Sequence, residues 1–304
     1  MSDIKLFRLT DGTVTDLEAS SVAVEKSLQG LIEQHLETFL GVLYVKTEHS
    51  TGPEHGGRID TLGLDENGCP VIIEYKRSTN ENVINQGLFY LDWLLDHEGD
   101  FYKLVLDELG KEQADAIDWS APRLICIAGD FTKYDEHAVK QINRNIDLIR
   151  YRRYGGEFLL FELVYAASTG AGPAKTEVAA AQTASADKSF ADQLSQSPAK
   201  LKDLYESLRA HLLALGDDVT EKEVKLYVAF RRIRNFACVV LHAGRQDMMV
   251  YVKVNPDEVA LEQGFTRDVR EIGHWATGDL EITIRTPEDL EKAEPLLVRS
   301  YESN

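Results

Sequence analysis

The stretch GGRIDTLGLDENGCPVIIEYKR, residues 56–77, decides the fold because it reads as two strands joined by a turn. The second strand begins with the apolar run Val71–Ile73 and continues without a break into the charged sequence EYKR. Side chains alternate along a strand, so Glu74 and Lys76 share one face. The strand therefore carries an acid and a base to the edge of a hydrophobic core.

The length of the turn decides whether Asp60 joins that face. A two-residue loop, Asn67-Gly68, would place Asp60 opposite Tyr75, on the wrong side of the sheet. A three-residue loop with Gly68 in the left-handed conformation would instead place Asp60 opposite Glu74. Directly opposed Cβ atoms lie about 4.5–5.5 Å apart. We expect the second register, in which two carboxylates can share one divalent cation.

Two carboxylates turned into one site repel each other unless a cation joins them. Oxygen ligands favour Mg²⁺ or Mn²⁺ over zinc. A lysine held beside the metal, here Lys76, can place or deprotonate a water and offset charge that builds on a phosphate. The alternative is that the strand simply emerges into water, with Glu74 and Lys76 as ordinary surface charges.

The flanking helices add polar residues to this picture. In a helix predicted over Val24–Leu40, Glu25 stands in the middle of the apolar stripe and Glu33 on its flank. Burying a carboxylate in an apolar stripe without a partner costs free energy, so Glu25 is expected to have a partner. A frayed helix end would also explain its position. In a second helix, predicted over Glu81–Asp96, Gln86 and Tyr90 share a face. That pair alone is also typical of the polar edge of an amphipathic helix.

Asp60, then Glu74-Tyr75-Lys76, then Gln86-x-x-x-Tyr90 resembles the PD-(D/E)XK nuclease superfamily. Over roughly residues 20–165 the sequence is similar to the nuclease domain of NucS-type endonucleases. The resemblance implies an α/β fold, a restriction-endonuclease-like mixed sheet flanked by helices. It also implies Mg²⁺- or Mn²⁺-dependent hydrolysis of phosphodiester bonds in a nucleic acid, with DNA the expected substrate. The implied metal ligands are Asp60, Glu74 and Glu25, and the other implied site residues are Lys76 as a catalytic group with Gln86 and Tyr90.

Two features depart from that pattern. Arg58-Ile59 stands where the superfamily has a proline-containing start. No counterpart of the separate N-terminal DNA-binding domain of NucS proteins is recognised, so we do not expect their substrate preference to carry over. His55, in the glycine-rich entry to the first strand, is a minor candidate near the metal.

The chain is expected to form a nuclease-like domain over residues 1–165 and a small α+β accessory domain over residues 190–304. Residues 166–189, rich in Ala, Ser, Thr, Gly and Lys, read as a flexible linker. The remaining predicted elements are a strand at 123–129, a helix at 135–150 and a strand at 157–165, then a helix at 198–215, strands at 226–242, 247–254 and 280–285, and a last helix capped by Thr286. Helices interleaved with short apolar strands indicate an α/β sheet covered on both faces.

The formal charge of −18 argues against simple nucleic-acid binding. Residues 1–165 hold 16 Lys and Arg against 29 Asp and Glu, or −13, and the remainder 17 against 22, or −5. A nucleic acid would have to meet a bound metal or local basic side chains. Candidate cations are Arg58 and Arg77 beside the hairpin, a group at 144–153, and Arg231, Arg232 and Arg234.

Three separated cysteines indicate neither a disulfide framework nor a zinc cluster, and no apolar run approaches the length of a bilayer span. We therefore expect a cytoplasmic protein with no membrane partner. The C-terminal region resembles an uncharacterised domain appended to such nucleases and offers a surface for substrate or for a protein partner. His242, His274 and Trp275 are tempting there, but their spacing does not predict a metal site.

Three hypotheses follow from these patterns. The first is a metal-dependent nuclease, and the second is a nuclease-derived module that binds nucleic acid without cleaving it. The third is a protein-interaction adaptor, which the acidic surface favours. For the arginines at 231–234, phosphate binding competes with simple pairing to the many surplus carboxylates.

Overall fold

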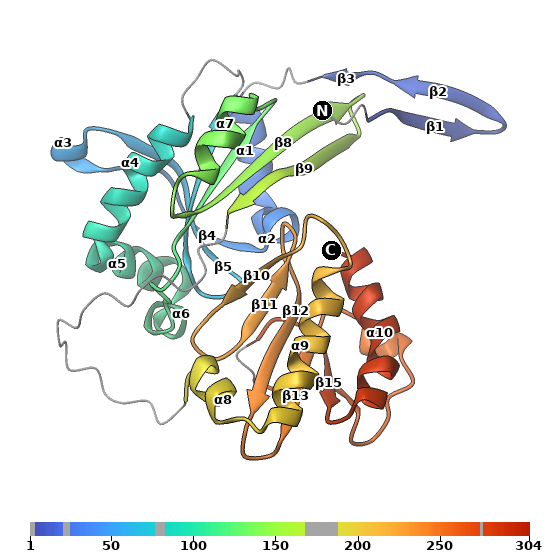
Figure 1. Ribbon diagram of the computed structural model, residues 1–304. Coiled ribbons are helices and arrows are strands. Elements are labelled where there is room, and N and C mark those ends of the chain that lie inside the picture. The colour runs from blue at the N-terminus through green and yellow to red at the C-terminus, as the bar shows by residue number, and fades with distance from the viewer. Residues whose placement is uncertain (1–3, 21–24, 77–82, 168–187, 274–275) are drawn as a thin grey trace. The chain divides into compact units, whose positions relative to one another are not determined.

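The computed structural model describes residues 4–20, 25–76, 83–167, 188–273 and 276–304, which form two compact units (Figure 1). The first unit comprises Met1–Asp65, Pro70–Ile117 and Pro122–Ala167, and the second Glu66–Cys69, Asp118–Ala121 and Ser168–Asn304. Most of the predicted linker, residues 168–187, lies outside the described residues. Among the helices described, none combines the length and apolar character needed to span a bilayer.

A mixed sheet of seven strands forms the centre of the first unit. Its strands are β3 (Ala19–Ser20), β4 (Val42–Ser50), β5 (Arg58–Asp65), β6 (Pro70–Lys76), β7 (Arg123–Ala128), β8 (Asn145–Tyr154) and β9 (Phe158–Ala167). The order is β3-β8-β7-β6-β5-β4, with β9 also beside β8. The parallel strands β6, β7 and β8 are the most deeply buried, as expected where helices cover both faces. A separate hairpin joins β1 (Leu6–Thr10) to β2 (Thr13–Leu17).

Helices lie on both sides of this sheet, with α1 on one side and α4 on the other (Figure 1). The helices are α1 (Glu25–Gln34), α2 (Leu36–Leu40), α3 (Gly52–His55), α4 (Val83–Asp96), α5 (Glu98–Leu109), α6 (Lys111–Asp115) and α7 (Lys133–Lys140). The single helix predicted over Val24–Leu40 is two helices, α1 and α2, separated at His35. Gly87 lets α4 approach the sheet, since a Cβ there would lie 2.5 Å from Leu124 Cδ1.

The helix predicted over residues 135–150 is wrong in its second half. Helix α7 starts with a capping box between Thr132 and Asp135 and ends at Lys140, and β8 begins at Asn145. Strand β8 pairs in parallel with β7 and antiparallel with β9, so its residues occupy the middle of the sheet. Charged residues in this segment suggested a solvent-facing helix. Asp147 is instead buried and accepts a hydrogen bond from Arg123, with 2.6 Å between Nε and Oδ2.

The second unit contains an antiparallel sheet of six strands in the order β10-β11-β12-β13-β15-β14. The strands are β10 (Thr220–Glu223), β11 (Val228–Arg231), β12 (Asn235–His242), β13 (Asp247–Val252), β14 (Thr266–Asp268) and β15 (Leu280–Ile284), and the helices are α8 (Phe190–Gln196), α9 (Ala199–Leu213), η1 (Pro256–Glu258) and α10 (Pro287–Glu302). The strand predicted over 226–242 is thus two strands, β11 and β12. Thr286 caps α10 as predicted.

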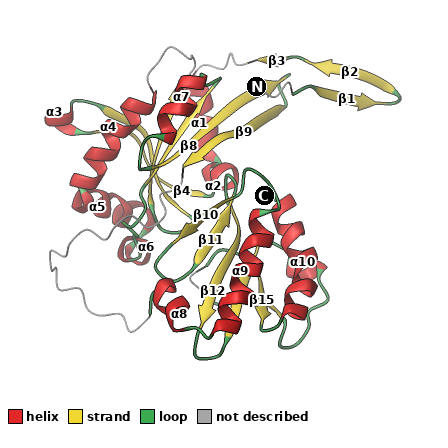
Figure 2. Ribbon diagram, in the orientation of Figure 1, coloured by secondary structure: helices red, strands yellow, loops and turns green. Residues whose placement is uncertain are grey.

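Helices α8, α9 and α10 cover one face of this second sheet (Figure 2). Met248, Val250 and Val252 of β13 join a core with Leu208 of α9 and Leu297 of α10. Because side chains alternate, the residues between them on β13 project from the opposite face. That face carries a smaller apolar cluster and, beside it, a group of charged side chains.

Candidate active site

The β5–β6 hairpin adopts the register predicted from its turn. Thr61 pairs with Ile73 and Leu62 with Ile72, so that paired residue numbers sum to 134. Gly68 has a φ of 74°, the left-handed conformation that the three-residue loop requires. The next pair beyond the ladder is Asp60 with Glu74, on one face of the sheet.

Beyond Thr61, the two carboxylates take the place of the ladder hydrogen bonds. Glu74 Oε1 accepts the backbone N–H of Asp60 at 3.2 Å, and Asp60 Oδ2 accepts the backbone N–H of Tyr75 at 3.0 Å. Each acid is therefore held by the strand that carries the other. Glu74 is 0% exposed, so the alternative of an ordinary surface charge is wrong for this residue.

Helix α4 contributes two side chains, Gln86 and Tyr90, that contact the hairpin. Gln86 Nε2 donates to Glu74 Oε2 at 3.0 Å and lies 3.3 Å from Tyr90 Oη, which accepts the backbone N–H of Arg58 at 3.1 Å. Gly57 makes room for this ring, because a Cβ there would lie 2.6 Å from Tyr90 Cε1. Gln86 and Tyr90 are thus brought to Glu74 and to the start of β5.

Helix α1 contributes Gln29, which the sequence patterns did not single out, and Glu33, which they placed on the flank of the apolar stripe. Gln29 Nε2 donates to the Asp60 carbonyl at 3.0 Å, and Thr61 Oγ1 donates to Glu33 Oε1 at 2.6 Å and lies 3.3 Å from Tyr75 Oη. Burial and, less strongly, the nearby acid Glu33 raise the pKa of Tyr75. This cluster lies on the opposite face of the hairpin from Glu74, where it fixes the end of β5.

Asp60 and Glu74 are two carboxylates that the described residues bring together. Within those residues no set of three or more His, Cys, Asp or Glu is arranged to hold a metal ion. Glu25 begins α1, but its side chain lies outside what the structure describes. Two carboxylates from adjacent strands fit Mg²⁺, which usually keeps several waters and binds through one or two carboxylates.

The basic residues predicted around the hairpin have different environments. Lys76 ends β6, partly exposed and on the same strand face as Glu74. Arg58 is largely exposed, with its Nε 2.6 Å from Glu48 Oε2. Arg77 lies outside the described residues.

A row of rings adjoins the site on α3, α4, β4 and the residue that precedes α5, and we call it the ring row. Its members are His49, His55, Phe89, Tyr90, Trp93 and His97. His55 lies 5.1 Å from Phe89 between ring centroids, and Trp93 stacks on His97 at 4.9 Å. Phe89 is 47% exposed, although it is a large apolar side chain next to Tyr90. Phe89 is the ring of this row that is exposed, whereas Tyr90 and Trp93 are buried.

Of the arginines predicted to bind nucleic acid in the second unit, Arg232 has side-chain contacts within that unit. Arg231 is buried on β11. Arg232 donates from Nε to Asp218 Oδ2 at 2.6 Å, and its guanidinium lies 4.8 Å from the Tyr301 ring centroid. Arg234 is partly buried in the turn after them. The contacts of Arg232 favour pairing with acids of the same unit over phosphate binding.

The other residues that the sequence analysis named lie in different environments. In the group at 144–153, Arg150 is buried and bonded to Asp130 and Glu162 at 2.7 and 2.8 Å. His242 lies next to Arg245, with 3.1 Å between its Nδ1 and the arginine Nη2. His274 and Trp275 are outside the described residues.

Comparison with known proteins gives relatives without an assigned activity. The family described as "Domain of unknown function (DUF5655)" matches residues 190–304. An uncharacterised protein of Haemophilus influenzae is 26% identical over 298 residues, which is 95% of this chain and 96% of that protein. The likeness to this relative therefore extends through both units.

Two solved structures are similar to part of the chain. One is the crystal structure of a repair endonuclease from Pyrococcus abyssi, with a TM-score of 0.29, 18% identity, and 42% of this chain and 47% of that chain covered. The other is described as "Structure of EndoMS-dsDNA2 complex", with a TM-score of 0.25, 19% identity, and 42% and 46% covered. The match spans less than half of each of those proteins, and at these TM-scores it carries no argument about function.

Proposed function

We propose that the first unit is a metal-dependent nuclease that hydrolyses phosphodiester bonds, with DNA as the expected substrate. The observation that carries the proposal is Glu74, fully buried at the end of an apolar strand with its carboxylate locked beside that of Asp60. Two adjacent carboxylates raise the free energy of the fold unless a cation or a proton offsets them. The hairpin holds these two carboxylates next to each other, and this favours a functional role.

In the proposed mechanism, Asp60 and Glu74 would hold Mg²⁺ or Mn²⁺, and Glu25 would be a third ligand. The bound ion would act as a Lewis acid on the phosphate and lower the pKa of a bound water. Gln86 holds the Glu74 carboxylate in one orientation through its 3.0 Å hydrogen bond. Lys76, two residues along the same face, would orient the attacking water and offset the charge that develops on the phosphate.

The ring row supports a nucleic acid as the substrate. An exposed aromatic ring can stack on a base that has left its helix, and such stacking is tolerant of base identity. Phe89 is the exposed ring of the row and lies on the same helix as Gln86, one turn later. We therefore expect an unpaired base beside the scissile phosphate to improve binding.

A digestion assay on the full chain tests the proposal. Plasmid DNA, single-stranded DNA and RNA are each incubated with Mn²⁺ or with EDTA, using the wild type, Asp60→Asn and a control, Asp92→Asn. Asp92 is an exposed acid of α4. We expect metal-dependent cleavage that Asp60→Asn lowers at least about 100-fold and Asp92→Asn leaves unchanged. Absence of cleavage on every substrate, or equal rates for all three proteins, would contradict the proposal.

A further inference from the structure

The face of the second sheet that points away from its helices carries a charged cavity of about 280 Å³. Alternation along the strands places Asp247 and Met249 of β13, and Glu281 and Thr283 of β15, on the face away from the helices. The cavity is lined by these four residues and by Arg245, Gly264, Phe265, Thr266, Arg267 and Arg285. We call it the arginine pocket.

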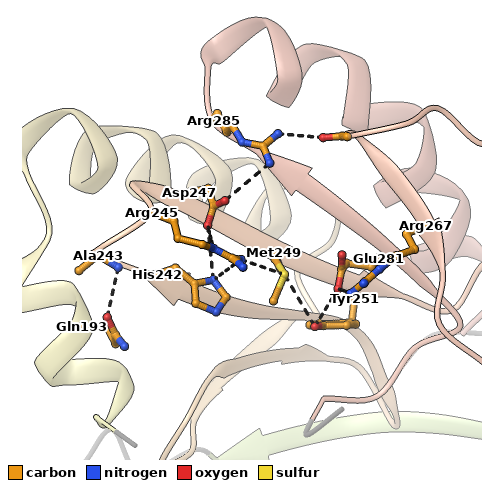
Figure 3. Close-up of polar contacts among 11 residues, drawn as sticks. Gln193, His242, Ala243, Arg245, Asp247, Met249, Tyr251, Arg267, Glu281 and Arg285 are labelled. Carbon is orange, nitrogen blue, oxygen red and sulfur yellow. Dashed lines mark hydrogen bonds and ion pairs between the residues drawn. The ribbon is translucent and has the colours of Figure 1, made fainter. Parts of the chain in front are cut away.

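Asp247 is the anchor on one side of the arginine pocket. It is 3% exposed, and its Oδ1 accepts from Arg245 Nε at 3.2 Å (Figure 3). Arg285 Nη2 lies 3.7 Å from the other oxygen of Asp247, while Arg285 Nη1 donates to the Gly264 carbonyl at 2.8 Å. A buried acid thus orients two guanidinium groups over the cavity.

Glu281 is the anchor on the other side. It is 4% exposed and accepts from Arg267 Nη2 at 2.7 Å and from Tyr251 Oη at 3.0 Å. Arg267 stands opposite Glu281 in the β14–β15 ladder, so its position is set by the sheet as well as by the ion pair. A buried acid therefore orients the guanidinium of Arg267, as Asp247 orients those of Arg245 and Arg285.

Positive charge exceeds negative charge in the arginine pocket. Three arginines against two acids give +1, whereas residues 190–304 as a whole hold 15 Lys and Arg against 20 Asp and Glu. The side chains of Arg245, Arg267 and Arg285 are 57%, 55% and 50% exposed. A guanidinium has five N–H donors, and within the described part of the chain Arg267 commits one nitrogen, Nη2. Donors remain for an anion.

We infer that the arginine pocket binds the phosphates of a nucleic-acid strand. Guanidinium groups bind phosphate through paired N–H donors, and groups already oriented by buried acids lose less freedom on binding. The cavity is near the lower end of the roughly 300–1,000 Å³ usual for small ligands, which suits a phosphate and its sugar. The inference goes beyond the proposed nuclease and does not require that the first unit cleaves its substrate.

The test measures binding by the full chain in EDTA, which separates this site from cleavage. Fluorescence anisotropy of a labelled single-stranded oligonucleotide is followed across a salt series for the wild type and for R245Q/R267Q/R285Q. The matched control is R270Q/K292Q/R299Q, three exposed cations of the same unit that lie in ion pairs outside the arginine pocket.

We expect the pocket variant to bind at least about tenfold more weakly, with a salt slope shallower by about 0.7 for each phosphate that the variant no longer binds. The control should stay within about twofold of the wild type, although it removes the same charge. R245K/R267K/R285K keeps the charges above Asp247 and Glu281 and serves if the glutamine variant does not fold. It should recover the slope but only part of the affinity, since an ammonium group lacks the planar pair of N–H donors with which a guanidinium binds phosphate.

Three results would overturn the inference. One is an affinity and slope of the pocket variant equal to those of the wild type. Another is an equal loss of affinity in the control, which would show a general charge effect. The third comes from calorimetry with a nucleoside monophosphate and with inorganic phosphate. If either binds the pocket while the oligonucleotide does not, the ligand is a free phosphate compound and not a strand.

Discussion

Buried acids lie in both units, but the charges beside them differ. In the candidate active site Asp60 and Glu74 face each other and Lys76 follows on the same face, a sum of −1. In the arginine pocket Asp247 and Glu281 lie under three arginines, a sum of +1. Burial of a carboxylate therefore does not by itself say what a site attracts. The sum of the charges around each site indicates which ion the site attracts. It favours a cation in the candidate active site and an anion in the arginine pocket.

The largest expected effect comes from removing the charged residues of the candidate active site one at a time. Glu74→Ala and Lys76→Ala should each lower cleavage at least about 100-fold. Their effects on Mn²⁺ affinity should differ, because Glu74 is a proposed ligand and Lys76 a neighbouring positive charge. Calorimetric titration should show weaker Mn²⁺ binding for Glu74→Ala and unchanged or tighter binding for Lys76→Ala.

Glu74→Gln controls for stability in that comparison, since its amide oxygen can still accept the Asp60 N–H. Glu74→Ala leaves that amide without its acceptor, which costs about 1–3 kcal/mol of unfolding free energy. Equal Mn²⁺ affinity for Glu74→Ala and Lys76→Ala would contradict the separate roles of Glu74 and Lys76.

The next effect tests whether the position of Tyr90 matters to Glu74. In Gly57→Ala the new Cβ would meet Tyr90 Cε1 at 2.6 Å, so the ring must move and disturb Gln86. We expect a loss of about 1–3 kcal/mol in stability and, from misplacement of about 1 Å, a loss of about 100-fold in cleavage rate. Gly99→Ala is the control, because a Cβ there meets open space. Similar rates in the two variants would show that Tyr90 does not support the site.

A smaller effect is expected in the ring row. Phe89→Ala should raise the KM for a single-stranded substrate about five- to tenfold and leave kcat nearly unchanged, since stacking contributes about 1–3 kcal/mol per base. Phe158→Ala, which removes another exposed phenylalanine of the same unit, should leave the KM unchanged. An equal change in both variants would mean that the ring row does not contact the substrate.

The smallest effect concerns the pKa of His242 at the edge of the arginine pocket. Burial and then Arg245 lower this pKa from its usual 6.5, while Asp247 acts in the opposite direction. The unfolded chain therefore binds the proton more readily, and the contribution to stability falls as the pH drops below 6.5. Arg245→Gln should raise the pKa and weaken this dependence, whereas Arg267→Gln should not. An NMR titration of the His242 ring checks the direction, and an unchanged pKa in Arg245→Gln would contradict it.

The centre of the site could be predicted because its determinants are local. The register of β5 and β6 follows from the loop ending in Gly68, and the pairing of Asp60 with Glu74 follows from the register. Gln86 and Tyr90 follow from helical spacing. Gln29 and Glu33 could not be assigned in this way, because their contacts with Asp60 and Thr61 span about 30 residues of chain.

The wrong helix over 135–150 and the environments of Arg231 and Arg232 share a physical cause, which is charged side chains that are buried or paired within the fold. Asp147 and Arg150 made β8 look like the polar side of a helix, although both are buried and paired. Arg231 and Arg232 looked like a basic surface, but one is buried and the other is bonded to Asp218. In the sequence an arginine looks the same whether it pairs with an acid far along the chain or faces solvent.

Anomalous scattering from a crystal of the full chain soaked in Mn²⁺ tests the central claim most directly. The account predicts a manganese peak on the α4 side of the β5–β6 hairpin, about 2.0–2.3 Å from oxygens of both Asp60 and Glu74. Glu74→Gln, soaked in the same way, should lose or weaken that peak. A peak bound by other residues, or carboxylates of Asp60 and Glu74 that ligate no metal at saturating Mn²⁺, would contradict it.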